Sequence, residues 1–345
     1  MRSYFRDSES SRSCFYLLYR SCINSKNKIL SLPMSALSIP FSGAKVLVTG
    51  ASGFIGHHLC QKLQQYQTEI YGVSRVQRES DSIIQWLQGD VASFDDMRRI
   101  IIQVKPDVIF HLAGHVTGTR GIDTVVSTLQ GNLVSTVNLL TLMAEFGGRR
   151  IVLVGSLEEP DAGEDSIPSS PYAAAKWASS AYAQMFQHLY QLPIVRTRPF
   201  LVYGPAQMDF KKLIPHVTLS LLKGEAPQIG SGQRQIDWIY VEDVVEGLIA
   251  AAQTPGVEGE VFELGSGTLT SISSVVQRIN QLVDPSIRPL FGALPDRPME
   301  QVRTANIEAS AQKLGWQPKI SLDQGLAKTV EWYSSYYSDL VCCRR

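Results

Sequence analysis

Cysteine is scarce in this sequence, and the few cysteines follow no metal-ligand pattern. Among 345 residues there are five, and most lie in the terminal segments: Cys14, Cys22, Cys60, Cys342 and Cys343. Such a distribution predicts a reduced compartment without structural disulfides and no metal site.

Long apolar runs and an excess of one charge are also absent. No apolar run reaches the roughly 20 residues that a membrane-spanning helix needs. The 32 basic and 32 acidic residues give a formal net charge of zero, which argues against a nucleic-acid surface or a polybasic membrane contact. Apolar residues make up 44% of the chain, which is typical of a soluble globular protein of one domain with a smaller companion.

Residues 1–33 are rich in serine and arginine and show little periodicity, whereas the sequence typical of a fold begins near Met34. An upstream translation start, a targeting segment and a disordered tail are the three interpretations. Transit peptides are basic and poor in acids, so Asp7 and Glu9 weaken the targeting interpretation. We expect a disordered or non-native extension on a cytoplasmic protein.

A glycine-rich turn follows the first predicted strand. Lys45–Thr49 is short, apolar and β-branched, and it runs into Gly50, Gly53 and Gly56 before a helix begins. Glycines allow the backbone to approach a pyrophosphate closely, and a helix N-terminus offers free N–H groups and a positive dipole. The turn therefore predicts a dinucleotide-binding site.

Tyr172 and Lys176 lie four residues apart on a predicted helix and so share one face. Ser170 can cap this helix, and Pro171 suits its first position. At ~4 Å and an effective dielectric of ~20, an ammonium attracts a phenolate by about 4 kcal/mol. The spacing therefore predicts a tyrosine whose pKa the lysine lowers for proton transfer.

Strands and helices alternate along most of the chain, which predicts a parallel sheet covered on both faces. The expected strands are Lys45–Thr49, Glu69–Arg75, Asp107–Ala113, Arg150–Ser156 and Leu192–Arg198. The expected helices include Leu129–Phe146, Tyr172–Tyr190, Ser273–Val283 and Leu322–Tyr333. The fold class is thus α/β, a doubly wound parallel sheet.

Several motifs stand in one order along the chain: Thr49–Gly56, His111–Gly114, Ser156, and Tyr172 with Lys176. Together they resemble the extended short-chain dehydrogenase/reductase family, within it the NAD(P)-dependent nucleotide-sugar epimerase, dehydratase and reductase branch. The resemblance runs from about Lys45 to Tyr333. It implies a Rossmann-type domain at 34–200 with a returning segment at 233–265, a smaller substrate domain from 201–232 and 266–335, and a tail at 336–345.

The resemblance also implies which residues hold the cofactor. They are Gly50, Ser52, Gly53, Phe54, Ile55 and Gly56 in the turn, Ser74, Arg75, Asp90 and Val91, then Leu112, Ala113, Gly114, Tyr172, Lys176, Pro199 and Val202. NAD enzymes usually end the second strand with an acid, whereas an arginine suits the 2′-phosphate of NADP. Ser74 and Arg75 stand there, with Arg78 close behind, so NADP(H) is favoured and NAD(H) stays open.

By the same resemblance, Ser156 bonds the reacting substrate oxygen, Tyr172 passes the proton, and Lys176 bonds the nicotinamide ribose. Asn132 shapes the site in the family, although an ordinary helical asparagine is an equal interpretation. Glu158 stands where dehydratases keep a catalytic glutamate, but Leu157 replaces the acid that often precedes it. The alternative is that Glu158 is an acidic loop residue exposed to solvent, without a catalytic role.

Two arginines are candidate contacts of a substrate diphosphate. Relatives have an arginine where this chain has Ile236, and Arg234 lies two residues earlier, facing the same way on a strand. Arg297 resembles the second contact. The resemblance further implies a homodimer in which the helices from Leu129 and Tyr172 form a four-helix bundle.

The function that we expect is an NAD(P)-dependent oxidoreductase on a nucleotide-linked sugar, with a 4-keto-sugar reductase favoured by Arg75 and the Val154–Ser156 context. A 4-epimerase or 4,6-dehydratase with retained cofactor is the alternative. A non-catalytic dinucleotide sensor is the other class, but such proteins usually lose Tyr or Lys, and this chain keeps both.

Overall fold

The computed structural model describes residues 40–160, 167–296 and 301–342, all within the compact unit Ser38–Arg345. Two expectations lie outside the described residues: the extension at 1–33 and the substrate contact Arg297. Among the described residues, no helix combines the length and the apolar character that crossing a membrane requires.

A seven-stranded sheet forms the centre of the described chain, and every strand in it is parallel to its neighbours. Its order is β3-β2-β1-β4-β5-β6-β9. The strands are β1 (Lys45–Thr49), β2 (Glu69–Ser74), β3 (Gln85–Gln88), β4 (Val108–His111), β5 (Arg150–Val154), β6 (Ile194–Pro199) and β9 (Val261–Leu264). The strands β2 and β3 lie on one side of β1, whereas β4, β5, β6 and β9 follow on its other side, so the strand order switches between β1 and β4. Ligands of such sheets bind outside the carboxyl ends of the strands at this switch point.

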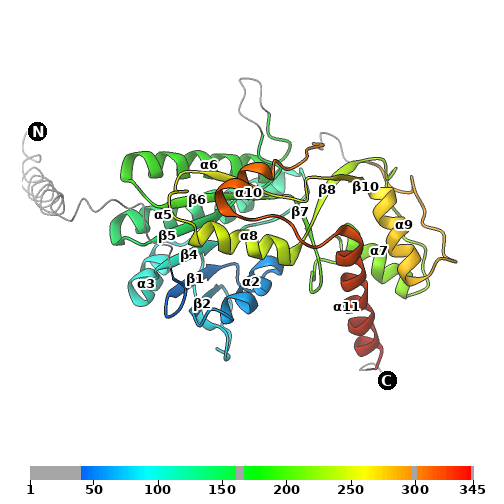
Figure 1. Cartoon of the computed structure of the whole chain (residues 1–345), viewed down its shortest axis with the longest axis horizontal. Helices are drawn as coiled ribbons and strands as arrows, with labels where there is room; N and C mark the ends of the chain where they lie inside the picture. The colour runs from blue at the N-terminus through cyan, green and yellow to red at the C-terminus, as the bar shows by residue number, and fades with distance from the viewer. Residues whose placement is uncertain (1–39, 161–166, 297–300, 343–345) are drawn as a thin grey trace, which may run out of the picture. The chain divides into compact units, whose positions relative to one another are not determined.

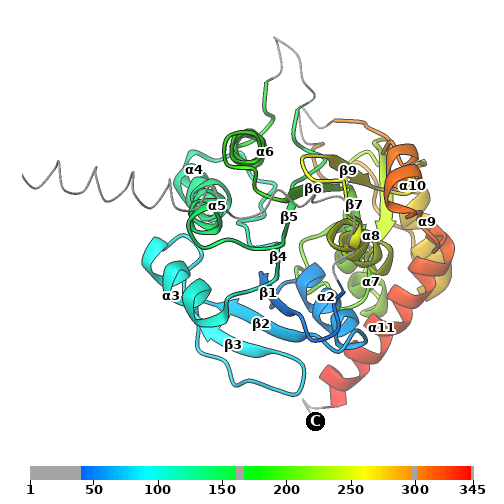
Figure 2. The same cartoon turned by 60° about the vertical axis from the view of Figure 1, so that its left-hand side comes forward.

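Helices cover both faces of this sheet (Figures 1 and 2). One apolar cluster packs α2 (Phe54–Gln64) and α8 (Val241–Gln253) against one face. The other packs α3 (Phe94–Val104), α5 (Ser135–Phe146) and α6 (Pro171–Tyr190) against the opposite face. Because both faces are buried, the central strands are continuous apolar runs, and all residues of β4 and β5 are buried.

A second sheet of three strands, in the order β10-β8-β7, lies beside the first. β8 pairs parallel to β7 and antiparallel to β10, and a third apolar cluster joins this sheet to α7, α9 and α11. The elements are β7 (Leu201–Tyr203), α7 (Leu213–Leu222), β8 (Gln235–Tyr240), β10 (Leu269–Ser271), α9 (Ile272–Val283) and α11 (Leu322–Cys342). The returning segment at 233–265 thus gives β8 to the small sheet, whereas its α8 and β9 belong to the large one. A short helix, α10 (Glu308–Leu314), follows.

Three differences from the predicted elements have physical reasons. The strand β3 was missed because its four residues, Gln85–Gln88, are neither β-branched nor buried. The last helix continues to Cys342, nine residues past Tyr333, because its aromatic residues stack on one another; the rings of Trp332 and Tyr336 lie 5.1 Å apart. The third difference lies in the helix expected at Leu129–Phe146.

That helix begins with a π-helical segment, η2 (Leu129–Val134), after η1 (Ile122–Thr124) and α4 (Val125–Thr128). Polar side chains donate hydrogen bonds to backbone carbonyls in this segment. Asn132 Nδ2 donates to the Thr128 carbonyl at 3.0 Å, and Thr136 Oγ1 donates to the Asn132 carbonyl at 2.6 Å. Side-chain donors of this kind compete with the regular helical bonds. A π-helical turn often marks a functional site.

Candidate active site

The glycine turn has the close backbone packing that the sequence predicts. Gly50 has φ +75°, and a Cβ on it would lie 2.7 Å from the Ala113 backbone nitrogen. A Cβ on Gly56 would lie 2.1 Å from the Gly50 carbonyl oxygen. The helix α2 begins with Gly53 as its N-cap, so no side chain covers its first N–H groups. These residues fit a dinucleotide pyrophosphate, which needs bare backbone at a helix N-terminus.

The other predicted cofactor residues lie on both sides of this turn. Ser52, Phe54 and Ile55 belong to it, and Leu112, Ala113 and Gly114 follow β4, which pairs with β1. Ala113 is tied to the turn because its N–H donates to Thr49 Oγ1 at 3.2 Å. Pro199 ends β6, and its carbonyl accepts from the Leu157 N–H at 3.3 Å, beside the turn of Ser156. Val202 lies half-buried in β7.

A cavity of about 630 Å³ opens beyond the end of β2. It is lined by Arg75, Gln88, Gly89, Asp90, Asp96 and Arg99. Arg78 turns back to Ser74, with Nε 3.3 Å from Oγ, and its guanidinium lies 5.1 Å from the centre of the Trp86 ring. One oxygen of Asp90 accepts from the Ala92 N–H, and Val91 packs half-buried against the core. Arg99 is a cavity residue that the sequence reasoning missed, because it lies on α3, outside the motif at Asp90 and Val91.

Ser156, Tyr172 and Lys176 come together at the carboxyl end of β5. The side-chain hydroxyls of Ser156 and Tyr172 are hydrogen-bonded to each other. The Lys176 ammonium donates to the Val154 carbonyl at 2.7 Å, and all three side chains are buried. The predicted cap holds the helix in place, because Ser170 Oγ accepts from the Ala173 N–H at 3.1 Å.

The pKa values of this pair differ from what the helical spacing predicts. Burial raises the pKa of the Tyr172 phenol, the hydrogen bond with Ser156 lowers it, and the charges of Glu158 and Glu159 raise it further. Burial lowers the pKa of Lys176 to about 8, while Glu159 acts in the opposite direction. The expected lowering of the Tyr172 pKa by Lys176 is therefore wrong for this arrangement, because the ammonium donates to Val154 and not to the phenol.

Asn132 lies in the π-helical segment and is buried beside the same centre. Its Nδ2 donates to the His115 carbonyl at 3.2 Å, and its backbone carbonyl accepts from Ser179 Oγ on α6 at 3.1 Å. A Cβ on Gly114 would lie 2.5 Å from Asn132 Oδ1 and 3.7 Å from the Lys176 ammonium. Asn132, Gly114 and Lys176 are therefore neighbours, which favours the site interpretation of Asn132 over an ordinary helical asparagine.

Two glutamates follow Ser156, and they differ in environment. Glu158 is half-buried; its N–H donates to Ser156 Oγ at 3.2 Å, and its carboxylate accepts from Ser170 Oγ at 3.3 Å. Glu159 is fully buried and was missed as a site residue. The sequence carried no signal for it, since two adjacent acids in a loop normally face solvent.

Arginines from the second half of the chain reach the same region. Arg303, also missed, donates to the carbonyls of Leu157 at 3.2 Å and Glu159 at 3.0 Å. Arg234 donates to the Gln301 carbonyl at 3.1 Å. A small cleft of about 10 Å³ between the two sheets is lined by Leu157, Phe200, Leu201, Arg234, Gln235, Ile236, Asp237, Gln301 and Arg303. Arg234 thus lines the same small cleft as Leu157, and its role as a substrate contact stays a prediction.

A family model matches residues 46–265, and its description is NAD dependent epimerase/dehydratase family. The chain belongs to this family. It is 30% identical over 310 residues to a UDP-glucose 4-epimerase of Mycolicibacterium smegmatis, covering 84% of this chain and 98% of that one. It is also 30% identical over 330 residues to a dTDP-glucose 4,6-dehydratase of Haemophilus influenzae, covering 84% and 97%.

A solved structure of an epimerase/dehydratase-family relative has the same fold. It is a UDP-glucuronic acid 4-epimerase from Bacillus cereus in complex with UDP-glucuronic acid and NAD, with a TM-score of 0.76 and 26% identity. The match covers 85% of this chain and all of that one. This chain is thus an enzyme of the epimerase/dehydratase family with a Rossmann-type fold, which confirms the predicted family and fold class. The sensor alternative is set aside.

Proposed function

We propose that the protein oxidises and reduces C4 of a nucleotide-linked sugar, and that the net reaction is 4-epimerisation. The observation that carries the proposal is the meeting of Ser156, Tyr172 and Lys176 beside the glycine turn. The relatives named above supply the substrate class, because they include 4-epimerases of UDP-sugars. This was the alternative of the sequence analysis, and it now precedes the reductase.

The side chains of the centre bind the substrate oxygen at C4 and transfer its proton. A bound nicotinamide would take up or return the hydride. Tyr172 accepts the proton of the C4 hydroxyl and later gives it back, and Ser156 donates to the same substrate oxygen. Since burial raises the pKa of Tyr172, the phenol is a strong base once it ionises. Lys176 belongs to the same buried centre, and its ammonium donates to the Val154 carbonyl.

The nucleotide-sugar diphosphate is proposed to lie against Arg234 at the mouth of the cleft between the two sheets, because Arg303 already donates to the Leu157 and Glu159 carbonyls and to Glu263. Guanidinium groups bind phosphate oxygens bidentately, and this cleft reaches Leu157, next to Ser156. The sugar would then extend from the cleft toward the reacting centre.

A 4-keto-sugar reductase is the second candidate, and the cavity beyond β2 favours it. Arg75 lines this cavity and could receive the 2′-phosphate of NADP(H), the usual reductant in cells, whereas Arg99 is paired with Asp96 at 3.3 Å. A 4,6-dehydratase has weaker support. The charge of Glu158 acts on Tyr172, as a base near the centre would, but Leu157 replaces the acid that often precedes it.

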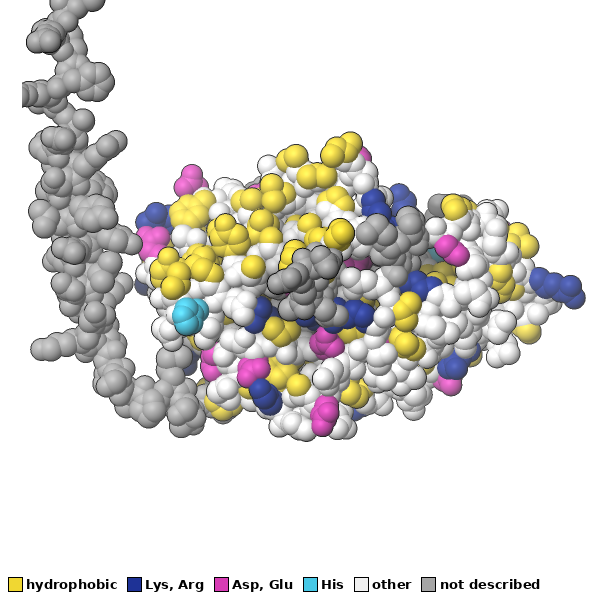
Figure 3. Space-filling view, turned by 90° about the horizontal axis from the view of Figure 1, so that it is seen from above, with side chains coloured by type: hydrophobic (Ala, Val, Ile, Leu, Met, Phe, Trp, Pro, Cys, Tyr) yellow, Lys and Arg dark blue, Asp and Glu magenta, His cyan; other side chains and the backbone are white. Residues whose placement is uncertain are grey.

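We also propose a homodimer. Apolar side chains are exposed along η1, α4 and α6: Ile122 is 88% exposed, Val126 61% and Leu189 62%. Figure 3 shows hydrophobic side chains gathered over the half of the molecule that carries α6. Contiguous apolar surface of this kind marks an interface. We expect Leu189→Glu to convert a dimer into a monomer in size-exclusion chromatography with light scattering, whereas an unchanged mass would contradict this interface.

The experiment that tests the function compares three assays on the purified protein. The epimerase converts UDP-glucose or UDP-glucuronic acid to its 4-epimer without net change in NADH absorbance and retains NAD through purification. A reductase releases its cofactor and consumes NADPH with a 4-keto nucleotide sugar. Consumption of NADPH without any epimer would overturn the epimerase proposal in favour of the reductase.

A further inference from the structure

Glu159 is a buried carboxylate that none of the roles above uses. Its exposed fraction is 0%. Oε1 accepts from the Ser156 backbone N–H at 2.8 Å, and Oε2 accepts from Ser180 Oγ at 2.6 Å. Both Nε and Nη2 of Arg198 lie 3.1 Å from Oε2. A buried carboxylate without partners is strongly destabilising, so these hydrogen bonds are what stabilises the Glu159 carboxylate in this position.

The backbone before Ser156 leaves room for this carboxylate. A Cβ on Gly155 would lie 2.1 Å from Glu159 Oε1 and 3.2 Å from the Thr197 carbonyl oxygen. The Gly155 N–H is itself fixed, because it donates to the Thr197 carbonyl at 2.7 Å. Neither β6 nor the carboxylate can move aside easily, so Gly155 and Glu159 depend on each other.

The backbone of Glu159 is bonded to a residue from the C-terminal part of the chain. Arg303 donates to its carbonyl at 3.0 Å and to Glu263 Oε1 at 2.8 Å, and its guanidinium lies 6.0 Å from the centre of the Phe200 ring. Arg303 also lines the cleft between the two sheets. The turn of Glu159 therefore connects that cleft to Ser156.

Few ionisable groups face Lys176. Glu159 is one peptide unit away from the Lys176 ammonium, which donates to the Val154 carbonyl at 2.7 Å, while the next residue, Gly155, packs against Glu159 Oε1. The charge of Glu159 favours the ammonium form of Lys176, against the larger effect of burial. His111, from β4, has its pKa lowered by burial to about 3, so it stays neutral above pH 5. The other ionisable groups around the centre are Tyr172, Glu158, Arg196 and Arg198.

We propose that Glu159 is a positioning residue. Its bond to the Ser156 N–H fixes Ser156 where its hydroxyl meets Tyr172, and its negative charge holds Lys176 as the ammonium. In this role Glu159 acts through Ser156 and Lys176 and makes no covalent bond. The part that concerns Ser156 rests on the proposed function; the part that concerns Lys176 does not.

Two conservative variants separate charge from geometry. Glu159→Gln keeps an oxygen for the Ser156 N–H but loses the charge, so the Lys176 titration midpoint should fall by about one pH unit. Glu159→Asp keeps the charge but is one carbon shorter, so the midpoint should stay while kcat falls about tenfold or more at similar KM. The midpoint is followed by NMR on protein labelled with ¹³C at lysine Cε, between pH 6 and 10, with Lys176→Arg to assign the signal.

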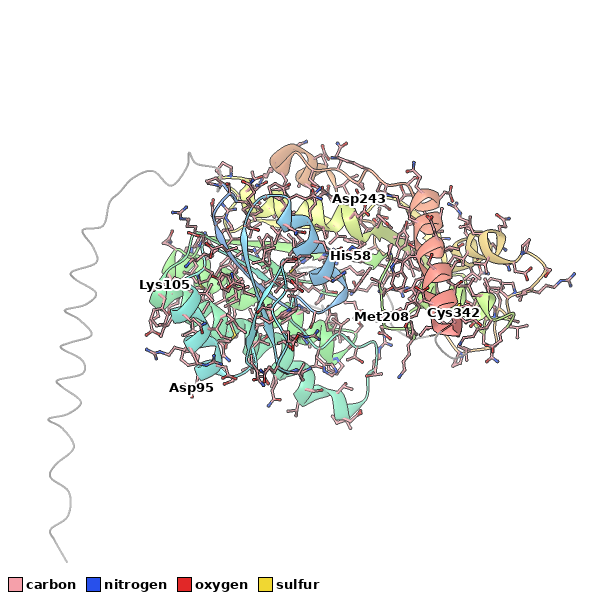
Figure 4. The ribbon with its side chains drawn as sticks, turned by 90° about the horizontal axis from the view of Figure 1, so that it is seen from below. His58, Asp95, Lys105, Met208, Asp243 and Cys342 are labelled. Carbon is pink, nitrogen blue, oxygen red and sulfur yellow. The ribbon has the colours of Figure 1, made fainter. Side chains whose placement is uncertain are left out.

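The matched control is Asp243→Asn. Asp243, on α8 (Figure 4), is a buried carboxylate that accepts from the Lys319 and Ile320 N–H groups, each at 3.0 Å. Its loss should lower stability and leave the Lys176 midpoint unchanged. An unchanged midpoint in Glu159→Gln overturns the charge role, and wild-type kcat in Glu159→Asp overturns the geometric role. Wild-type protein that turns over no nucleotide sugar refutes the proposed function instead, and the NMR titration still decides the charge role.

Discussion

Lys176 should lower the stability of the folded protein at neutral pH. It is 6% exposed, and burial lowers its pKa from the ordinary 10.5 to about 8. At about 1.4 kcal/mol for each tenfold change in proton affinity, this corresponds to roughly 3 kcal/mol. Below pH 8 both folded and unfolded chains are protonated and the whole penalty is present. Between pH 8 and 10.5 the unfolded chain binds more protons, so the free energy of unfolding rises with pH.

Lys176→Met removes this penalty and abolishes turnover. It also leaves the Val154 carbonyl without the donor that lies at 2.7 Å, which costs about 1–2 kcal/mol. We therefore expect the variant to be more stable than the wild type by about 1–2 kcal/mol at pH 7. The advantage should shrink as pH rises and reverse near pH 10, where the wild-type amine is neutral in the folded state.

Urea unfolding at pH 6.5, 8 and 9.5, followed by circular dichroism, measures this difference. Lys62→Met is the control, since Lys62 forms a surface ion pair with Glu246 at 2.7 Å and should change stability by no more than about 0.5 kcal/mol. A Lys176→Met variant that is less stable than the wild type at pH 7 would refute the reasoning. A stability difference that does not vary with pH would refute it too.

Three further predictions concern the cofactor and the chemistry. Tyr172→Phe should abolish turnover and leave NADH binding intact by fluorescence titration; retained turnover would remove Tyr172 from the mechanism. Gly56→Ala should weaken NADH binding at least tenfold, because the new Cβ would lie 2.1 Å from the Gly50 carbonyl oxygen and displace the turn. Unaltered affinity would contradict the proposed binding of the pyrophosphate at this turn. Arg75→Ala should weaken NADPH binding by about 1–3 kcal/mol and NADH binding little, as one charge-assisted bond is lost; equal losses would rule out a 2′-phosphate contact.

The sequence predicted well those features that depend on local rules. The turn from Gly50 to Gly56 and the cap at Ser170 are set by backbone space and by one hydrogen bond, and residue types report both directly. The parallel strands were found because strands buried on both faces are continuous apolar runs.

Features that depend on tertiary contacts were not predictable. The pKa of Tyr172 depends on how deeply α6 is buried and on where the Lys176 ammonium turns, and helical spacing fixes neither. Arg303 reaches its site from a segment without helix or strand that is distant in sequence from Leu157 and Glu159. Glu159 resembles a solvated loop acid until Arg198 and the space above Gly155 are seen.

The glycine turn and the groups around Ser156 have different parts in the proposed reaction. In that proposal the glycine turn and the pair Tyr172 and Lys176 serve oxidation and reduction at one carbon, whichever product results. The fate of that product depends on groups that hold the substrate and set the second proton transfer, and here these lie in the turn after Ser156. Because Arg303 lines the proposed substrate cleft and donates to the Glu159 carbonyl, a ligand that displaced Arg303 would also displace the Glu159 backbone. Substrate binding and the alignment of Ser156 should therefore be coupled, so that truncating the nucleotide lowers kcat as well as raising KM.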